Sequence, residues 1–279
     1  MLRVPWRGRL PKVSRLTHGR GIILKSRREI ELIRCAGRVV YRVLRKMEEL
    51  AAPGVSTAEL NAAAEEMIAQ EGGIPLFKGV ENPQAKFPFP AALCTSVNEE
   101  LVHGIPSDRM LREGDIVSVD CGVRLGGYCG DSATTIAIGK VSSATQHLLD
   151  VTRRTLELAM ELVRPGRMWS EVASRMQAYV EGEKLSVVRE FVGHGIGREM
   201  HEEPKVPNFW NDSQKRLDFK LLPKMVLAVE PMVNLGGYAV DYSGDDRWVV
   251  VTKDRKYAAH FEHTIAVTET GVDVLTDGR

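Results

Sequence analysis

The chain has 279 residues, of which 43% are hydrophobic and 27% are charged, and its formal net charge is +1. This length allows one large domain or two small ones with a sizeable core. The balanced charge gives no general argument for binding to nucleic acid or membranes. No stretch approaches the run of about 20 apolar residues that spans a bilayer.

Positive charge is nevertheless concentrated near the N-terminus, where residues 1–28 hold nine lysines and arginines and no acidic residue. We interpret residues 1–25 as a basic segment that precedes the folded domain. It is either a disordered leader or an anchor for RNA or another polyanion. It lacks the apolar core of a secretory signal.

Cysteine usage indicates a reducing compartment. No two cysteines form a CxxC pair, which argues against a structural zinc module and favours free thiols in a cytoplasmic protein. The four cysteines are Cys35, Cys94, Cys121 and Cys129.

Two capping boxes predict a pair of helices in the first third of the chain. Ser26 with Glu29 begins one helix, and Ser56 with Glu59 begins another that runs to about residue 70. Pro-Gly and Gly-Gly pairs end them. Residues 74–92, rich in proline, phenylalanine and glycine, are predicted to form an irregular loop before a strand at 93–97.

Residues 114–131, GDIVSVDCGVRLGGYCGD, are predicted to form a β-hairpin. Apolar and polar residues alternate along its first arm, and two glycines supply flexibility for a turn. If the turn centres on Leu125 and Gly126, Asp120 and Asp131 face each other with Cβ atoms roughly 5 Å apart. Two carboxylates that close among valines and isoleucines repel and lose hydration, so a bridging divalent cation would stabilise them.

The second half of the chain repeats this plan. Ser143 with Gln146 is predicted to cap a helix, and a further helix is predicted over 171–181. Alternating residues predict strands at 187–192 and 224–230.

The repetition extends to the acidic residues. Asp120 and Glu230 are each followed five residues later by Leu-Gly-Gly-Tyr, and Asp131 and Glu262 each precede Thr-Ile-Ala. We therefore predict one domain at 26–279, built from two homologous halves (about 26–141 and 142–279) related by a pseudo-two-fold axis. The expected fold is α/β (α+β), with a central antiparallel sheet covered by helices.

This symmetry would bring Asp120 and Asp131 of one half to Glu230 and Glu262 of the other. Four carboxylates exceed what one cation needs and suit two bridged divalent ions. His194, in the stretch Gly-His-Gly-Ile-Gly, is the best candidate for a nitrogen ligand because the glycines leave its imidazole unhindered. Such a set favours Mn, Fe(II) or Co over a structural zinc ion.

Other acidic and histidine residues receive no ligand role. Glu202 and Glu203 follow His201 but have no counterpart in the other half, so we interpret them as loop residues or as residues beside the ligands. The histidines that lie in no comparable context are His18, His147, His260 and His263.

From about Ser26 to Thr276 the chain resembles the type I methionine aminopeptidases, which have the pita-bread fold. The motifs are weak one by one and specific together. They are SVNEELVHGIP (96–106), GDIVSVD (114–120), GD (130–131), VGHGIGREMHEEP (192–204), VEPMV (229–233) and FEHTIAV (261–267).

The resemblance implies a role for each matching residue. Asp120, Asp131, His194, Glu230 and Glu262 would bind two divalent metal ions (Co, Mn, Fe(II) or Zn). Asp131 and Glu262 would bridge the ions, and Glu230 would also act as general base toward the bridging water.

His103 and His201 match two family histidines that contact substrate near the scissile bond. The implied reaction is removal of the initiator methionine from nascent proteins when the next residue is small. An apolar pocket for the methionine would be lined by Phe89, Cys94, Met200 and Trp248. Family members often carry phenylalanine where Met200 stands, and the loop at 77–90 is longer and rich in proline.

Two other functions remain open: a proline-directed aminopeptidase of the same fold, and a non-catalytic, ribosome-binding relative. The short interval between His201 and Glu230 excludes the large helical insertion of type II enzymes, and all five ligands are present. The family also implies a monomer acting on nascent chains, without membrane association. The basic segment 1–28 would then help it dock to the ribosome.

Overall fold

The computed structural model describes residues 17–18 and 21–279. Most of the basic segment predicted at 1–25 therefore lies outside the described residues. Within the described part, no helix is long and apolar enough to cross a membrane. The helices are α1 (Arg27–Leu50), α2 (Thr57–Gln70), α3 (Ser143–Leu162), α4 (Trp169–Gly182) and the short 3-10 helix η1 (Asp212–Gln214).

The helix starts test the capping predictions. The boxes at Ser26 and Ser56 are confirmed, each with its glutamate three residues later. The prediction for α3 is wrong by one residue, because Ser142 adopts the extended conformation and accepts the N–H of Thr145 at 3.1 Å. Helix α4 begins two residues earlier than predicted because the buried ring of Trp169 stacks on a phenylalanine and anchors the first turn.

The strands are short except for two. They are β1 (Thr17–His18), β2 (Ile22–Ile23), β3 (Ile74–Pro75), β4 (Leu93–Val97), β5 (Glu100–Val102), β6 (Ile116–Leu125), β7 (Tyr128–Ala137), β8 (Ser186–Val187), β9 (Gly193–Gly195), β10 (Glu202–Val206), β11 (Val226–Val229), β12 (Met232–Asn234), β13 (Val240–Tyr242), β14 (Val250–Thr252), β15 (Ala258–His260), β16 (His263–Val267) and β17 (Val272–Val274).

The predicted strand at 187–192 is wrong. Strand β8 pairs with β12, whereas β9 pairs with β10 and β11, so the chain must turn between them. The strand predicted at 224–230 is confirmed in a shorter form, since Lys224 has a φ of 73° and belongs to the turn before β11. Part of the loop predicted at 74–92 forms β3, which pairs with β6.

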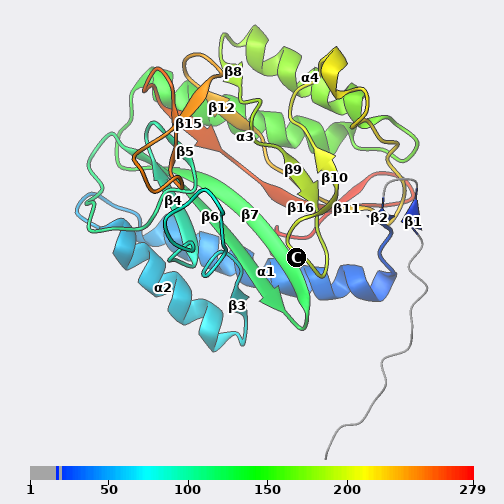
Figure 1. The fold of residues 1–279 in the computed structure, drawn as a ribbon, viewed down its shortest axis with the longest axis horizontal. Coiled ribbons are helices and arrows are strands. Elements are labelled where there is room, and N and C mark those ends of the chain that lie inside the picture. Colours follow the sequence, from blue (N-terminus) through cyan, green and yellow to red (C-terminus); the bar gives the residue numbers. More distant parts are fainter. Residues whose placement is uncertain (1–16, 19–20) are drawn as a thin grey trace, which may run out of the picture.

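The helices lie on opposite sides of the strands in the view of Figure 1, with α1 and α2 below and α3 and α4 above. Helix α1 packs against β6 and β7, and α3 packs against β12 and β15. Strands β3, β4, β6 and β7 form one antiparallel sheet, and the other large sheet has the strand order β10-β9-β11-β16-β17.

The hairpin of β6 and β7 turns one residue later than predicted. Gly126 and Gly127 both have positive φ (58° and 83°), the signature of a two-residue turn with right-handed strand twist. As a result Asp131 pairs with Gly122, and Asp120 pairs with Ala133. The two aspartates are diagonal neighbours on one face, not directly opposite.

The second carboxylate pair stands on strands that are distant in the sequence. Strand β11 pairs with β16, and Val229 lies opposite His263. Glu230, directly after β11, and Glu262, directly before β16, therefore lie next to each other at one end of this strand pair. The second Leu-Gly-Gly-Tyr, at residues 235–238, does not connect these strands. It lies after β12, which pairs with β15.

Hydrogen bonds join β7 to the chain around β16. The Thr264 hydroxyl donates to the backbone oxygen of Asp131 at 2.7 Å, and the backbone N–H of Glu262 donates to Ala133 O at 2.9 Å. The Thr135 hydroxyl donates to His260 O at 2.8 Å. These contacts bring the acidic residues of both strand pairs to one place.

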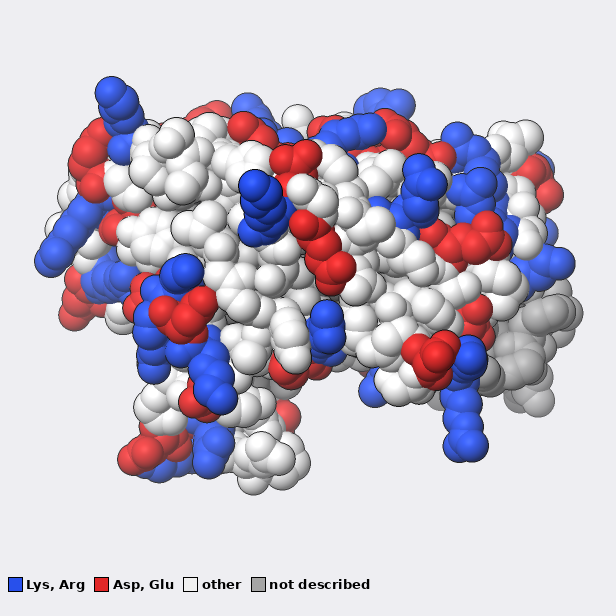
Figure 2. Space-filling view, turned by 90° about the horizontal axis from the view of Figure 1, so that it is seen from above, with Lys and Arg blue, Asp and Glu red and all other residues white. Residues whose placement is uncertain are grey.

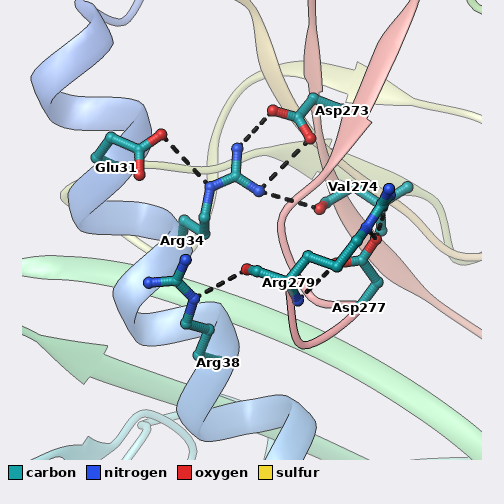
Figure 3. Close-up of polar contacts among 7 residues, drawn as sticks. All are labelled: Glu31, Arg34, Arg38, Asp273, Val274, Asp277 and Arg279. Carbon is teal, nitrogen blue, oxygen red and sulfur yellow. Dashed lines mark hydrogen bonds and ion pairs between the residues drawn. The ribbon is translucent and has the colours of Figure 1, made fainter.

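An ion pair and hydrogen bonds hold the C-terminal residues against α1. Figure 3 shows the Arg34 guanidinium between Glu31 and Asp273, with a further bond to Val274 O at 3.4 Å. Arg38 Nε donates to Arg279 O at 2.9 Å. The last strand of the second half is thereby tied to the first helix of the first half.

The surface charge is mixed. Figure 2 shows lysines and arginines interspersed with aspartates and glutamates over one face of the molecule. The described residues of that face present no field of a single sign, which agrees with the small net charge.

Candidate metal centre and substrate cavity

A single cavity of about 700 Å³ is lined by every residue that the sequence analysis assigned to the site. These residues are Phe89, Cys94, His103, Asp120, Asp131, His194, Met200, His201, Glu230, Trp248 and Glu262. The cavity has an acidic end, where the carboxylates converge, and an apolar end, where the aromatic residues pack.

The acidic end is deeply buried. Asp131 and Glu262 are each only 2% exposed. One ligand atom from each of Asp131, His194 and Glu262 lies within 4.8 Å of the others. His194 Nε2 also lies 3.6 Å from Glu230 Oε1, so the imidazole faces both strand pairs.

These carboxylates lack counter-charges of their own. Among the described residues, no lysine or arginine forms an ion pair with Asp120, Asp131, Glu230 or Glu262. Burial raises the pKa of Asp120 to about 7. Burial and repulsion from neighbouring carboxylates raise the pKa of the other three well above the ordinary range.

Unpartnered oxygens indicate what the cluster is built to hold. Asp120 Oδ1, Asp131 Oδ1 and Glu262 Oε1 are buried and have no hydrogen-bond partner. Such groups are costly unless a cation or a proton satisfies them. Divalent cations that prefer oxygen ligands fit this donor set.

His194 is oriented for coordination. Its Nδ1 lies 3.0 Å from Gly195 O, and a proton on that nitrogen leaves the lone pair of Nε2 directed at the carboxylates. Burial lowers the pKa of His194 to about 4, which keeps the imidazole neutral. A neutral imidazole is the form that binds metals.

Two further histidines flank the acidic end. The His201 ring lies 4.4 Å from that of His194 in an edge-to-face arrangement. His103 contacts Trp248 at 6.3 Å between ring centroids and therefore reaches the apolar end. Burial lowers the pKa of both His103 (to about 4) and His201, so each is a neutral donor near pH 7.

His260 also lines the cavity, although the sequence analysis gave it no role. It is buried, and its Nε2 lies 3.8 Å from Glu230 Oε2 without a hydrogen bond. Burial lowers the pKa of this imidazole to about 3. No local sequence pattern predicts this placement, because residues 261 and 262 separate β15, which ends at His260, from β16, and these two strands belong to different sheets.

The apolar end is a small aromatic cluster. Phe89 and Trp248 pack edge to face with centroids 5.2 Å apart, and Trp248 Nε1 donates to Phe87 O at 2.8 Å. Cys94 and Met200 pack against this cluster. Cys94 pairs with Asp120 across β4 and β6, so the apolar surface begins directly beside the carboxylates.

The fold and this buried acidic cluster define a metallopeptidase. The model of metallopeptidase family M24 matches residues 31–269. A methionine aminopeptidase of Bacillus subtilis is 46% identical over 255 residues, which cover 91% of this chain and 99% of the relative. A methionine aminopeptidase of Aquifex aeolicus is 41% identical over 257 residues.

Solved structures agree. The crystal structure of a Thermotoga maritima methionine aminopeptidase matches with a TM-score of 0.85 and 38% identity, over 91% of this chain and 99% of that one. A Pyrococcus furiosus prolidase, 21% identical with a TM-score of 0.69, shares the fold. The chain belongs to the methionine aminopeptidases of family M24, and is a metal-dependent aminopeptidase with the pita-bread fold. The predicted family, fold and enzyme class are confirmed.

Proposed function

We propose that this chain removes the N-terminal methionine from peptides and nascent proteins whose second residue is small, using two divalent cations. The observation that carries the proposal is one cavity with unpartnered, buried carboxylate oxygens at one end and an apolar cluster at the other. Such a cavity suits a cationic metal centre beside a thioether side chain.

The cations would be held by five residues: Asp120, Asp131, His194, Glu230 and Glu262. Asp131 and Glu262, which the hydrogen bonds between β7 and the chain around β16 bring together, would be the two residues shared by both cations. When bound, such ions lower the pKa of water and polarise a carbonyl. Co, Mn, Fe(II) and Zn all accept this mixture of oxygen and nitrogen ligands.

The chain's own residues would then move protons and orient the peptide. Glu230 would be the general base that takes a proton from the attacking water and passes it to the departing amine, so that the peptide C–N bond breaks after the new C–O bond has formed. His103 and His201, both neutral, donate N–H groups to the scissile carbonyl and to the departing amine. Phe89, Cys94, Met200 and Trp248 enclose the methionine side chain.

The first experiment is methionine release from a Met-Ala-Ser peptide by metal-stripped protein, with Mn, Co, Fe(II) or Zn added back singly. Metal-dependent release supports the proposal, and calorimetry of the same titrations counts the ions. An X-Pro peptide tests the proline-directed alternative. Folded protein that binds metal but cleaves neither peptide would point to the non-catalytic alternative.

The same proposal covers the domain organisation, the oligomeric state and the cellular location. We infer that residues 26–279 act as one catalytic unit, that the protein is a cytoplasmic monomer, and that the basic segment 1–28 helps it dock to ribosomes. Sedimentation of the purified protein tests the monomer. Deleting residues 1–20 should lower co-sedimentation with ribosomes at low salt while leaving Met-Ala-Ser cleavage intact. Unchanged co-sedimentation would contradict the docking role.

A further inference from the structure

A buried ion pair lies next to the cavity and outside the proposed ligand set. Lys25 Nζ contacts Glu202 Oε2, and the two side chains are 4% and 10% exposed. Among the lysine and arginine ion pairs of the described residues, this is the one in which neither side chain is more than 10% exposed. A buried pair contributes little net stability but fixes one geometry, since removing either partner leaves an unpaired charge.

Both partners are anchored independently of each other. The backbone N–H of Lys25 donates to Lys224 O at 2.8 Å, just before β11. Glu202 opens β10, where it pairs with Gly195 of β9. The ion pair therefore links the entry to α1 with the sheet that carries His194.

The Glu202 carboxylate also closes the segment between β9 and β10. Its Oε1 accepts the backbone N–H of Arg198 at 2.9 Å and of Glu199 at 3.3 Å. A Cβ at Gly197 would lie 2.5 Å from Lys25 Cε and 2.7 Å from Glu202 Oε1, so a larger residue there would have to displace the ion pair. Residues 197–201, here called the His201 loop, therefore contact the ion pair through Gly197 and through the backbone N–H groups of Arg198 and Glu199.

The His201 loop presents two side chains to the cavity. His201 meets the His194 ring at 4.4 Å, and Met200 packs in the apolar cluster. We propose that the Lys25–Glu202 ion pair positions the His201 loop, so that His201 and Met200 face the substrate. This inference rests on the proposed methionine-removing function, and Lys25 and Glu202 act in it as positioning residues without touching substrate.

The test is a double variant, Lys25→Met with Glu202→Gln, which removes both buried charges but keeps an amide oxygen for the loop N–H groups. With Met-Ala-Ser and Mn, its kcat/KM should fall about 10- to 100-fold, because small misplacements of a catalytic group have effects of this size. Its Mn affinity and stoichiometry by calorimetry should equal those of the wild type, since the five ligands are untouched. The single variant Lys25→Arg, which keeps a positive charge opposite the unchanged Glu202, should retain most of the wild-type kcat/KM.

The matched control is Lys46→Met with Glu49→Gln, an exposed lysine–glutamate pair on α1 with an N–O distance of 3.1 Å. It should change kcat/KM less than about twofold. A readout apart from activity is the imidazole NMR signal of His201, assigned with His201→Asn. That signal should shift or broaden in the Lys25 and Glu202 double variant, while the signal of the exposed His147 stays in place.

A double variant with a lower Tm but unchanged kcat/KM and an unchanged His201 signal would overturn the inference, because the pair would then serve stability alone. The methionine-removing function fails in a different way, when the wild type itself releases no methionine with any metal. In that case the His201 signal still decides whether the ion pair positions the loop.

Discussion

Each of the two strand pairs brings two carboxylates together, but the chain connects the paired strands in different ways. Strands β6 and β7 are joined by two glycines, and their aspartates are brought together by a turn that is local in sequence. Strands β11 and β16 are separated by residues 230–262, so the glutamates beside them, Glu230 and Glu262, are brought together by residues far apart in the sequence. This long connection is called the excursion of the second half. That excursion also supplies Trp248 and His260 to the cavity.

This difference separates two tasks of the site. The hairpin of the first half contributes its two aspartates to the cavity and no residue of its turn, whereas the chain between β11 and β16 contributes further residues to the cavity wall. Equivalent carboxylate positions thus impose few constraints on the chain between them. Substitutions in the two strand pairs measure how far the pairs are equivalent.

The largest effect is expected for one carboxylate of each pair. Asp131→Asn and Glu262→Gln should each lower kcat/KM for Met-Ala-Ser by at least about 100-fold, because each removes a charged ligand oxygen that both cations would share. Calorimetry with Mn should show reduced stoichiometry in both variants. Asp150→Asn, on the exposed face of α3, is the control. If one variant retains activity, the two pairs do not form one symmetric centre.

Metal-stripped protein is expected to lose stability between pH 6.5 and pH 8. Carboxylates of the unfolded chain are ionised there, whereas burial holds the pKa of Asp120 at about 7 and raises those of Asp131, Glu230 and Glu262. The folded state therefore binds more protons than the unfolded state. Each additional bound proton makes the free energy of unfolding fall by about 1.4 kcal/mol for every unit by which the pH rises. Thermal unfolding in chelator measures this slope.

The buried histidines do not reverse this sign. Their pKa values are lowered, so their contribution is present above about pH 6.5, the unfolded value, and is lost only as the pH falls toward 4. Saturating Mn should flatten or invert the slope because the metal binds the ionised carboxylates. Metal-free stability that rises from pH 6.5 to 8 would show that the two pairs do not repel each other.

The two Leu-Gly-Gly-Tyr segments should respond differently to the same substitution. Gly127 has a φ of 83°, so Gly127→Ala should destabilise the protein by about 1–2 kcal/mol through left-handed backbone strain. Gly237 lies outside the left-handed region with no atom within 4 Å of an added Cβ. Gly237→Ala should therefore change stability by less than about 0.5 kcal/mol. Equal losses in urea unfolding would contradict the contrast.

The smallest effect concerns the excursion of the second half. Trp248→Phe keeps an aromatic ring against Phe89 but loses the 2.8 Å bond to Phe87 O. Without this bond the ring beside the methionine side chain is held less firmly, which should raise KM for Met-Ala-Ser about fivefold, or about 1 kcal/mol, and leave kcat unchanged. Trp210→Phe, a ring that does not line the cavity, provides the comparison. A change in kcat alone would mean that Trp248 does not line the methionine pocket.

Sequence patterns predicted more of the helices and motifs than of the strand pairing. Capping boxes are local, so Ser26 and Ser56 could be read directly. The hairpin turn was misplaced by one residue because Leu-Gly and Gly-Gly both fit a two-residue turn, and only twist and packing select between them. The strand predicted at 187–192 failed because its two ends pair with different strands, which no local pattern records.

The sequence by itself determined the acidic residues, their repetition in two halves and the family to which they belong, because these features are written in residue types and spacing. The tertiary structure alone decided that His260 faces Glu230 and that Lys25 reaches Glu202, 177 residues away. It also decided that Glu230 and Glu262 meet through β11 and β16. The physical reason is that burial and non-local pairing depend on how the sheets assemble, and residue order does not specify that packing.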